Sequence, residues 1–241
     1  VNLQIADAQL KPLGGLLAKE LENLLPKKKN SSKKTKLKIS LNKKLNLGKE
    51  GYRLEIGQKE ISIQSSTYAG AFYATRSLLQ LLQQNNDSLV CGAFEDKPTY
   101  RFRSVMLDVG RKFVPFEELK DWVKTLAYFK INELHLHLND SCDGNFHGFR
   151  LEMKNFPGLA SKDGHYTQKQ IRELQDFAHL HAVAIIPEID SPGHARSFST
   201  IRPDLAHPHL GGDYLDLNKP ETLEFMKTVF DEIAPLFDSK H

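Results

Sequence analysis

Three apolar runs in the second half of the chain each end on polar residues. They span residues 105–111 (VMLDVGR), 134–140 (LHLHLND) and 184–194 (AIIPEIDSPGH). Near-continuous apolar runs are typical of strands that are buried on both faces of a parallel sheet. In α/β proteins, ligands bind beyond the carboxyl ends of such strands. The pattern therefore predicts three parallel strands, with the chemistry of the protein at their polar ends.

Segments with a helical repeat follow each of these runs. Apolar residues recur every three or four positions over residues 116–128, 166–180 and about 221–237, which predicts three amphipathic helices. Two acidic residues open the first helix, as the helix dipole favours, and Thr167 is a candidate N-cap of the second. The alternation of strand and helix predicts a parallel sheet built from right-handed crossover units.

The first hundred residues show a different pattern. A leucine-rich helix is predicted over residues 10–25, and alternating segments at 37–41, 52–56 and 61–65 predict an antiparallel sheet. A strongly apolar helix over 68–82 would cover one face of that sheet. We therefore expect a small α+β domain without obvious chemistry at 1–98, followed by a second domain at 99–241.

Composition and charge narrow the function classes. The hydrophobic share is 40% and the charged share 26%, as in soluble globular proteins. No run approaches the roughly 18 apolar residues of a membrane span. Residues 27–44 hold nine lysines and no acid, which we interpret as a solvated loop rather than a nucleic-acid surface. Cys91 and Cys142 are too few for a metal cluster or a disulfide framework, and whether they pair stays open.

The segments FRSVMLDVGRKF, HLHLND and IPEIDSPGH occur in this order behind YRLEI, YAGAFYATRSLLQLL and DKP. Together they resemble the family 20 glycoside hydrolases, the β-N-acetylhexosaminidases. The resemblance implies a non-catalytic α+β domain followed by the first three β/α units of a (β/α)8 TIM barrel. The barrel would be incomplete, because the chain stops before the fourth strand. The parent protein would supply the remainder.

The resemblance also implies roles for five residues. Arg111 matches the arginine that binds ring hydroxyls of the terminal sugar, and a guanidinium fork can donate to two vicinal oxygens. Asp140, Asp190 and His194 match residues of the network that supports the catalytic acid/base. Glu188 matches the glutamate of the E-I-D segment, and we expect it to contribute to substrate binding. Carboxylates at strand ends often only cap backbone amides, which is the alternative for Glu188.

Two histidines allow a metal-binding alternative. His135 and His137 point to the same face of a strand and could share a metal, as in amidohydrolase barrels. They lie inside the strand, however, whereas catalytic groups gather at its end, and the resemblance gives them a packing role. We therefore expect neither a metal nor an organic cofactor.

The segment HLGGDY, residues 209–214, is similar to the H-x-G-G-D-E segment that carries the family's catalytic Asp-Glu pair. Tyr214 replaces the glutamate, and a tyrosine with a pKa of about 10 is a poor acid for this step. The segment also precedes the third helix, whereas the fourth strand must follow it. We therefore predict that Gly211 and Gly212 lie in a loop and that the catalytic pair lies beyond His241.

The function implied by the resemblance is hydrolysis with retention at a terminal non-reducing β-linked N-acetylhexosamine, GlcNAc or GalNAc. The substrate's own 2-acetamido oxygen would act as the nucleophile. The substrate would be an oligosaccharide or glycoconjugate, and the 241 residues alone would be inactive. We favour a secreted or periplasmic over a cytoplasmic location.

Alternatives remain for the sugar unit that the enzyme releases and for the class of protein. Ser141 follows Asp140 where many members have a second aspartate, and the longer loop after it leaves GlcNAc, GalNAc or a larger unit open. A metal-dependent TIM-barrel hydrolase would bind zinc between the two strand histidines. A non-catalytic sugar-binding fragment would bind N-acetylglucosamine without turnover.

Overall fold

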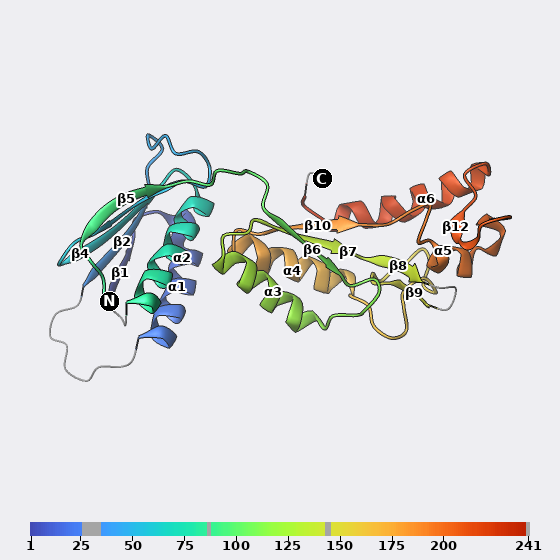
Figure 1. The fold of residues 1–241 in the computed structure, drawn as a ribbon, viewed down its shortest axis with the longest axis horizontal. Helices are drawn as coiled ribbons and strands as arrows, with labels where there is room; N and C mark the ends of the chain where they lie inside the picture. Colours follow the sequence, from blue (N-terminus) through green and yellow to red (C-terminus); the bar gives the residue numbers. More distant parts are fainter. Residues whose placement is uncertain (26–34, 86–87, 143–145, 240–241) are drawn as a thin grey trace. The chain divides into compact units, whose positions relative to one another are not determined.

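The computed structural model describes residues 1–25, 35–85, 88–142 and 146–239, and it divides into two compact units (Figure 1). The first unit comprises Val1–Phe102 with two short segments, Ala127–Lys130 and Leu180–Ala182. The second comprises Arg103–Leu126, Ile131–His179 and Val183–His241. Within the described part of the chain, no helix is long and apolar enough to cross a membrane.

The first unit is a five-stranded sheet with two helices on one face (Figure 1). The strands, in their order across the sheet, are β1 (Asn2–Ile5), β2 (Lys36–Leu41), β4 (Glu60–Ser65), β3 (Tyr52–Ile56) and β5 (Gly92–Asp96). The helices are α1 (Lys11–Leu24), which follows a 3-10 turn η1 (Ala8–Leu10), and α2 (Tyr68–Gln84). Leu13 and Leu17 of α1 and Phe72 of α2 are fully buried, so both helices contribute to one core.

The sheet of the first unit is mixed, so the prediction of an antiparallel sheet is wrong for part of it. β3 and β4 form an antiparallel hairpin, but β2 runs parallel to both β1 and β4. The connection 42–51 crosses the end of β4, where Asn42 N donates to Ser65 O (2.7 Å) and Ser66 Oγ donates to Gly48 O (3.0 Å). Alternation of side chains has the same period in both kinds of ladder, so the sequence pattern did not reveal the direction.

Two sequence observations from this unit have partial outcomes. The lysine-rich segment falls largely on residues 26–34, outside the described residues, whereas Lys36 and Lys38 lie in β2. Cys91 is a free, exposed thiol.

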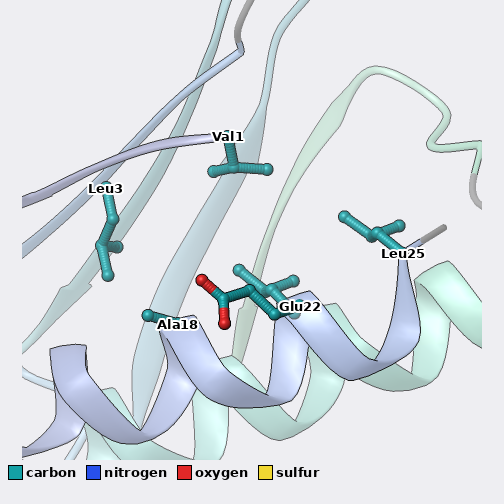
Figure 2. A pocket seen from close by; sticks show the side chains of 6 residues that line it. Val1, Leu3, Ala18, Glu22 and Leu25 are labelled. Carbon is teal, nitrogen blue, oxygen red and sulfur yellow. The ribbon is translucent and has the colours of Figure 1, made fainter. Parts of the chain in front are cut away.

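A pocket of about 240 Å³ lies between β1 and α1 (Figure 2). Its lining is mostly apolar and consists of Val1, Leu3, Ala18, Leu21, Glu22 and Leu25.

The second unit contains the three predicted parallel strands and the three predicted helices. The strands, in order across the sheet, are β10 (Ala184–Glu188), β7 (Glu133–His137) and β6 (Ser104–Asp108). The helices are α3 (Phe116–Tyr128), α4 (Gln168–Leu180) and α6 (Pro220–Ile233), which ends in a 3-10 turn η3 (Ala234–Leu236). Shorter elements are β8 (Asn139–Cys142), β9 (Phe146–Phe149), α5 (Arg196–Ile201), η2 (Pro203–Leu205), β11 (Ala206–His207) and β12 (Gly211–Leu215).

The predicted N-cap of α4 is confirmed. Gln170 N donates to Thr167 Oγ1 (3.1 Å), and Thr167 N donates to Gln170 Oε1 (2.9 Å). This reciprocal pair is a capping box, which satisfies two amides that the helix itself leaves without partners. α3 and α4 lie side by side (Figure 1), where Lys120 Nζ contacts Glu173 Oε1 at 2.6 Å.

The two faces of the β10-β7-β6 sheet differ in burial. Leu134, Leu136 and Ile185 point to one face and are buried in the core. On the other face, Met106 is 57% exposed and lies next to His135 in the strand register. Among the described residues, β6 and β10 also pair on one side only. This face is therefore only partly covered, and these edges are unpaired, in the described part of the chain.

Gly211 and Gly212 lie in strand β12, so the prediction of a loop is wrong. β12 pairs antiparallel with β11, and the hairpin docks on the chain after β10. Ala195 N donates to Asp213 O and Leu215 N to Pro192 O, both at 2.9 Å. These bonds join segments that are distant in sequence, which a local reading does not detect. Gly211 has φ +76°, the left-handed conformation that glycine adopts without strain at the turn.

Candidate functional site

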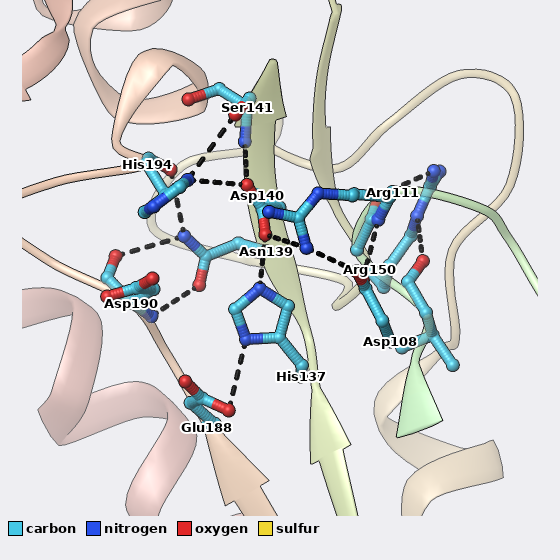
Figure 3. A network of polar contacts seen from close by, with 12 residues as sticks. Asp108, Arg111, His137, Asn139, Asp140, Ser141, Arg150, Glu188, Asp190 and His194 are labelled. Carbon is cyan, nitrogen blue, oxygen red and sulfur yellow. Dashed lines mark hydrogen bonds and ion pairs between the residues drawn. The ribbon is translucent and has the colours of Figure 1, made fainter. Parts of the chain in front are cut away.

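The ends of the three parallel strands bring their polar residues into one cluster (Figure 3). Asp108, His137 and Glu188 are the last residues of β6, β7 and β10, and they are direct neighbours in the strand register. Side chains opposite one another in a sheet point to the same face. The register therefore places these three groups in one row at the carboxyl edge of the sheet.

Asp140 is the centre of the cluster and is 1% exposed. Its Oδ2 atom lies 2.8 Å from Arg111 Nη1 and 2.5 Å from His137 Nε2. Its Oδ1 atom lies 2.7 Å from His194 Nδ1 and accepts a 2.6 Å hydrogen bond from Ser141 N. Arg111, Asp140 and His194, predicted from three different strand ends, thus meet at one carboxylate. A buried charge is stable only when it is paired in this way.

Arg111 is oriented by a second carboxylate. Its backbone N donates to Asp108 Oδ1 (2.9 Å), and its Nη1 donates to Asp108 Oδ2 (2.6 Å). Burial alone would raise the pKa of Asp108, but the hydrogen bonds from Arg111 lower it below the ordinary aspartate value. The side chain of Arg111 is 47% exposed, so the guanidinium is fixed on one side by carboxylates and faces solvent on the other.

His137 lies between two carboxylates. Its Nε2 atom contacts Asp140, and its Nδ1 atom lies 3.0 Å from Glu188 Oε2 at an angle unsuited to a hydrogen bond. His135 Nε2 approaches the same glutamate oxygen at 2.8 Å. Burial alone would lower the pKa of His137, but its contacts with Asp140 and Glu188 raise it above the ordinary value. The folded site therefore favours the charged imidazolium more than water does.

Asn139 is fully buried and ties the segment after β10 to the site. Its Nδ2 donates to the carbonyl oxygens of Asp190 (3.0 Å) and His194 (3.4 Å), and its Oδ1 accepts from Asp190 N (2.7 Å). The Asp190 carboxylate lies in a group with His137 and Glu188 whose atoms are within 4.8 Å of one another. Asn139 thus fixes the backbone that presents both Asp190 and His194.

His194 has an uncommon backbone conformation. Its φ is +50°, in the left-handed region that few residues other than glycine occupy. Its side chain is 49% exposed, yet Nδ1 reaches the buried Asp140. The opposite edge of the ring is therefore available to a bound molecule, while Asp140 holds the first edge.

Two groups of side chains have the spacing of metal ligands. Asp108, His137 and Asp140 form one group, and His137, Glu188 and Asp190 form the other. A cation in the first group would compete with Arg111, which already contacts both aspartates. A cation in either group would also require a neutral His137, whose pKa is raised. The arrangement therefore favours an ion-pair network over a metal centre.

Asp213 does not have the environment of a catalytic acid. Arg196 holds it by two hydrogen bonds, of 2.8 Å from Nε and 2.6 Å from Nη2. These bonds lower the pKa of Asp213. The neighbouring Tyr214 is exposed. The HLGGDY segment therefore contains an ionised, paired aspartate and a surface tyrosine.

The sequence prediction did not include Asp108, His137, Asn139 or Arg150 among the site residues. Asn139 and His137 lie directly within the LHLHLND run, so polar residues at its last inward positions were a usable signal. Arg150 follows two buried positions of β9 and is itself fully buried, a fact that becomes visible only in three dimensions.

Comparisons with known proteins give consistent matches for both units. Residues 100–241 match "Glycosyl hydrolase family 20, catalytic domain", and residues 1–97 match "Glycosyl hydrolase family 20, domain 2". The chain is 31% identical to a β-hexosaminidase of Porphyromonas gingivalis over 97% of this chain and 34% of that protein. It is 29% identical to a lacto-N-biosidase of Bifidobacterium bifidum over 88% of this chain and 18% of that protein.

A solved structure is similar to this chain over the residues of both units. The exo β-N-acetylglucosaminidase of Vibrio harveyi, in complex with N-acetylglucosamine, is similar with a TM-score of 0.83 and 28% identity. That match covers 99% of this chain and 42% of the other. The chain spans 43% of the β-hexosaminidase of Akkermansia muciniphila, to which it is 31% identical over 79% of its own length.

Proposed function

The chain belongs to glycosyl hydrolase family 20, and on this basis we propose that the protein containing it is a β-N-acetylhexosaminidase. It releases terminal non-reducing β-linked GlcNAc or GalNAc from oligosaccharides or glycoconjugates. The observation that carries the proposal is the convergence of Arg111 and His194 on the buried Asp140 at the ends of parallel strands.

The second unit is the first part of a TIM barrel in this proposal. Residues 99–241 would supply three of eight β/α units, and 1–98 would form the non-catalytic α+β domain. The partly covered sheet face with the half-exposed Met106 supports this, because later strands of a barrel would cover it. The single-sided pairing of β6 and β10 among the described residues supports it too, because closure removes sheet edges.

Arg111 binds hydroxyls of the terminal sugar ring. Its guanidinium is held on one side by Asp108 and Asp140, so little side-chain entropy is lost when a sugar contacts the exposed side. Glu188 contacts His135 and His137, so its contribution to substrate binding passes through the orientation of these rings.

Asp140, Asp190 and His194 support the acid/base group. Hydrolysis proceeds with retention, because the acetamido oxygen of the substrate attacks the anomeric carbon. A glutamate, expected beyond His241 together with its preceding aspartate, protonates the leaving oxygen. His194, which is held by Asp140, presents its outer edge toward that glutamate and tunes its pKa by hydrogen bonding and charge.

The full-length protein and an aryl β-N-acetylglucosaminide test this function. We expect turnover with initial release of the β-anomer, observed by proton NMR. Asp140→Asn should lower kcat/KM by about 100-fold or more, because a buried network loses its charge. Asp204→Asn, which alters an exposed aspartate paired with Arg202, should change it less than about 2-fold.

Two outcomes would contradict the proposal. Initial release of the α-anomer would exclude retention. Saturable binding of N-acetylglucosamine by the full-length protein without turnover of GlcNAc, GalNAc or disaccharide aryl glycosides would favour a sugar-binding protein. Comparison of these three aryl glycosides also decides the unit that the enzyme releases, which the loop after Ser141 leaves open. Residues 143–145 of that loop lie outside the described residues.

A further inference from the structure

Among the described residues, Arg150 is one of the largest fully buried side chains, and it lies directly after β9. Its Nε donates to Val109 O (2.8 Å) and its Nη2 to Gly110 O (3.0 Å). Its Nη1 donates to Asp163 Oδ1 (2.6 Å) and to Gly164 O (2.8 Å). Every nitrogen of the guanidinium therefore has a partner, as a buried charge requires.

The peptide groups that Arg150 binds are fixed from the other side as well. The carbonyl oxygen of His137 accepts hydrogen bonds from Val109 N (3.2 Å) and Gly110 N (2.8 Å). Both the amide and the carbonyl group of each of these two residues thus form hydrogen bonds. They immediately precede Arg111, so they set the point from which its side chain starts.

Close packing leaves this peptide no alternative position. A Cβ atom on Gly110 would lie 2.8 Å from the carbonyl carbon of Asn139. A Cβ atom on Gly148 would lie 2.2 Å from Gly110 O and 3.0 Å from Arg150 Nη2. Real Cβ atoms essentially never approach another atom to 2.2 or 2.8 Å, so both glycines are needed for the strand ends to approach each other.

We propose that Arg150 is a positioning residue for Arg111, acting through the peptide groups of Val109 and Gly110. The inference rests on the proposed function, because it takes Arg111 to be the group that contacts the sugar. Arg111 has a long side chain that is half exposed, so its reach depends on where its backbone is held. Errors of about 1 Å in a binding group can cost a factor of about 100 in rate.

The geometry requires an arginine rather than any cation. Its bonds reach three carbonyl oxygens and one carboxylate from three separate nitrogen atoms. A lysine has one nitrogen with three donors and cannot span these positions. Arg150→Lys keeps the charge opposite Asp163 but releases the carbonyls of Val109 and Gly110, so it separates positioning from charge.

Steady-state kinetics of the full-length enzyme with an aryl β-N-acetylglucosaminide test this inference. Arg150→Lys should raise KM about 10-fold and change kcat less than about 3-fold, because a misplaced Arg111 weakens ground-state and transition-state binding together. In an Arg111→Lys background, the same change should raise KM less than about 2-fold. Arg202→Lys, which alters an exposed arginine, is the matched control and should have no effect.

Two results would overturn the role of Arg150. Independent, multiplicative losses in the double variant would show that Arg150 does not act through Arg111. A fall in kcat at constant KM would indicate loss of folded protein instead. If Arg150→Lys does not fold, Asp163→Asn replaces it, because this carboxylate is 58% exposed. It should raise KM about 2-fold to 5-fold in the wild type and not in the Arg111→Lys background.

Hydrogen exchange separates this inference from the proposed function. In the full-length protein, Arg150→Lys should speed amide exchange in peptides that contain Gly110 and leave peptides from β3 unchanged. This measurement needs no turnover. An inactive wild type with faster exchange in the variant would refute the proposed function, but it would support the positioning of the Val109 and Gly110 peptides by Arg150. Unchanged exchange would refute this positioning role of Arg150 even in an active enzyme.

Discussion

Nε2 of His137 lies 2.5 Å from Oδ2 of Asp140. The ring is nearly buried, and its other nitrogen contacts Glu188, so one imidazole connects the carboxylate of Asp140 in β8 with that of Glu188 in β10. A proton on this ring balances part of the negative charge that the strand ends collect. The histidine therefore does more than pack in the core, which is the role that the family resemblance implied for it.

The pH dependence of stability should report this ring. Its pKa in the folded chain lies above the ordinary value of about 6.5, so folding favours the protonated form. The resulting stabilisation is fully present below about pH 6.5 and is lost as the pH rises through the folded-state pKa. We expect the free energy of urea unfolding to fall more steeply with pH in the wild type than in His137→Gln.

The control for this measurement is His179→Gln. His179 lies on the exposed side of α4, and its replacement should change the pH slope less than His137→Gln does. Equal slopes in the wild type and His137→Gln would show that the ring is not preferentially protonated in the folded state.

Asn139→Asp should destabilise the second unit by about 2–4 kcal/mol. The substitution turns the donor that faces the carbonyl oxygens of Asp190 and His194 into an acceptor inside a buried site. Urea unfolding followed by circular dichroism measures the loss. Asn218→Asp, at an exposed position, should cost less than about 0.5 kcal/mol. Equal effects of both substitutions would show that the hydrogen bonds of Asn139 with Asp190 and His194 do not stabilise the fold.

Glu232→Gln should destabilise the chain by about 1–2 kcal/mol, because its carboxylate accepts hydrogen bonds from the amides of Lys154 and Asn155. The Gln168 side chain donates to the same group at 2.8 Å. Glu224→Gln on the exposed side of the same helix is the control and should be nearly neutral. A thermal midpoint that is the same for both variants would show that the hydrogen bonds from Lys154 and Asn155 to Glu232 do not stabilise the fold.

Asp213→Asn in the full-length enzyme should lower kcat less than about 5-fold. Its carboxylate is already ionised and held by Arg196, so it has no proton to donate at neutral pH. Removal of a true general acid lowers the rate by about 100-fold to 10,000-fold. A loss in that range, measured with an aryl β-N-acetylglucosaminide, would show that the HLGGDY segment does carry catalysis.

Local periodicity was sufficient to predict the three parallel strands and the three long helices of the second unit. The apolar runs and the three-and-four repeats each report on one element, and α3 begins and ends at the residues expected. The prediction failed where pairing depends on distant segments. β2 pairs in parallel with β4 because the connection 42–51 crosses the sheet end, and β12 forms because it docks on the chain near Pro192.

For the site as well, local patterns were predicted, whereas contacts between distant residues were not. Polar residues at strand ends identified Arg111, Asp140 and His194 as neighbours, because parallel strands end at the same edge. The groups that hold them escaped detection, since their significance lies in their partners. Asn139 matters through Asp190, and the buried arginine after β9 matters through two carbonyl oxygens in the chain before Arg111.

Because residue 148 is a glycine, the chain at 148 can lie against the chain at Gly110, and this contact couples the evolution of the two segments. The carbonyl of Gly110 occupies the space that a methyl group there would need. A lineage that acquired any other residue at 148 would have to move the chain after β6 outward, together with the arginine that it carries. Glycine at 148 and arginine at 150 should therefore be inherited as a pair, and homologues that lost one would be expected to have rebuilt their contact with the sugar.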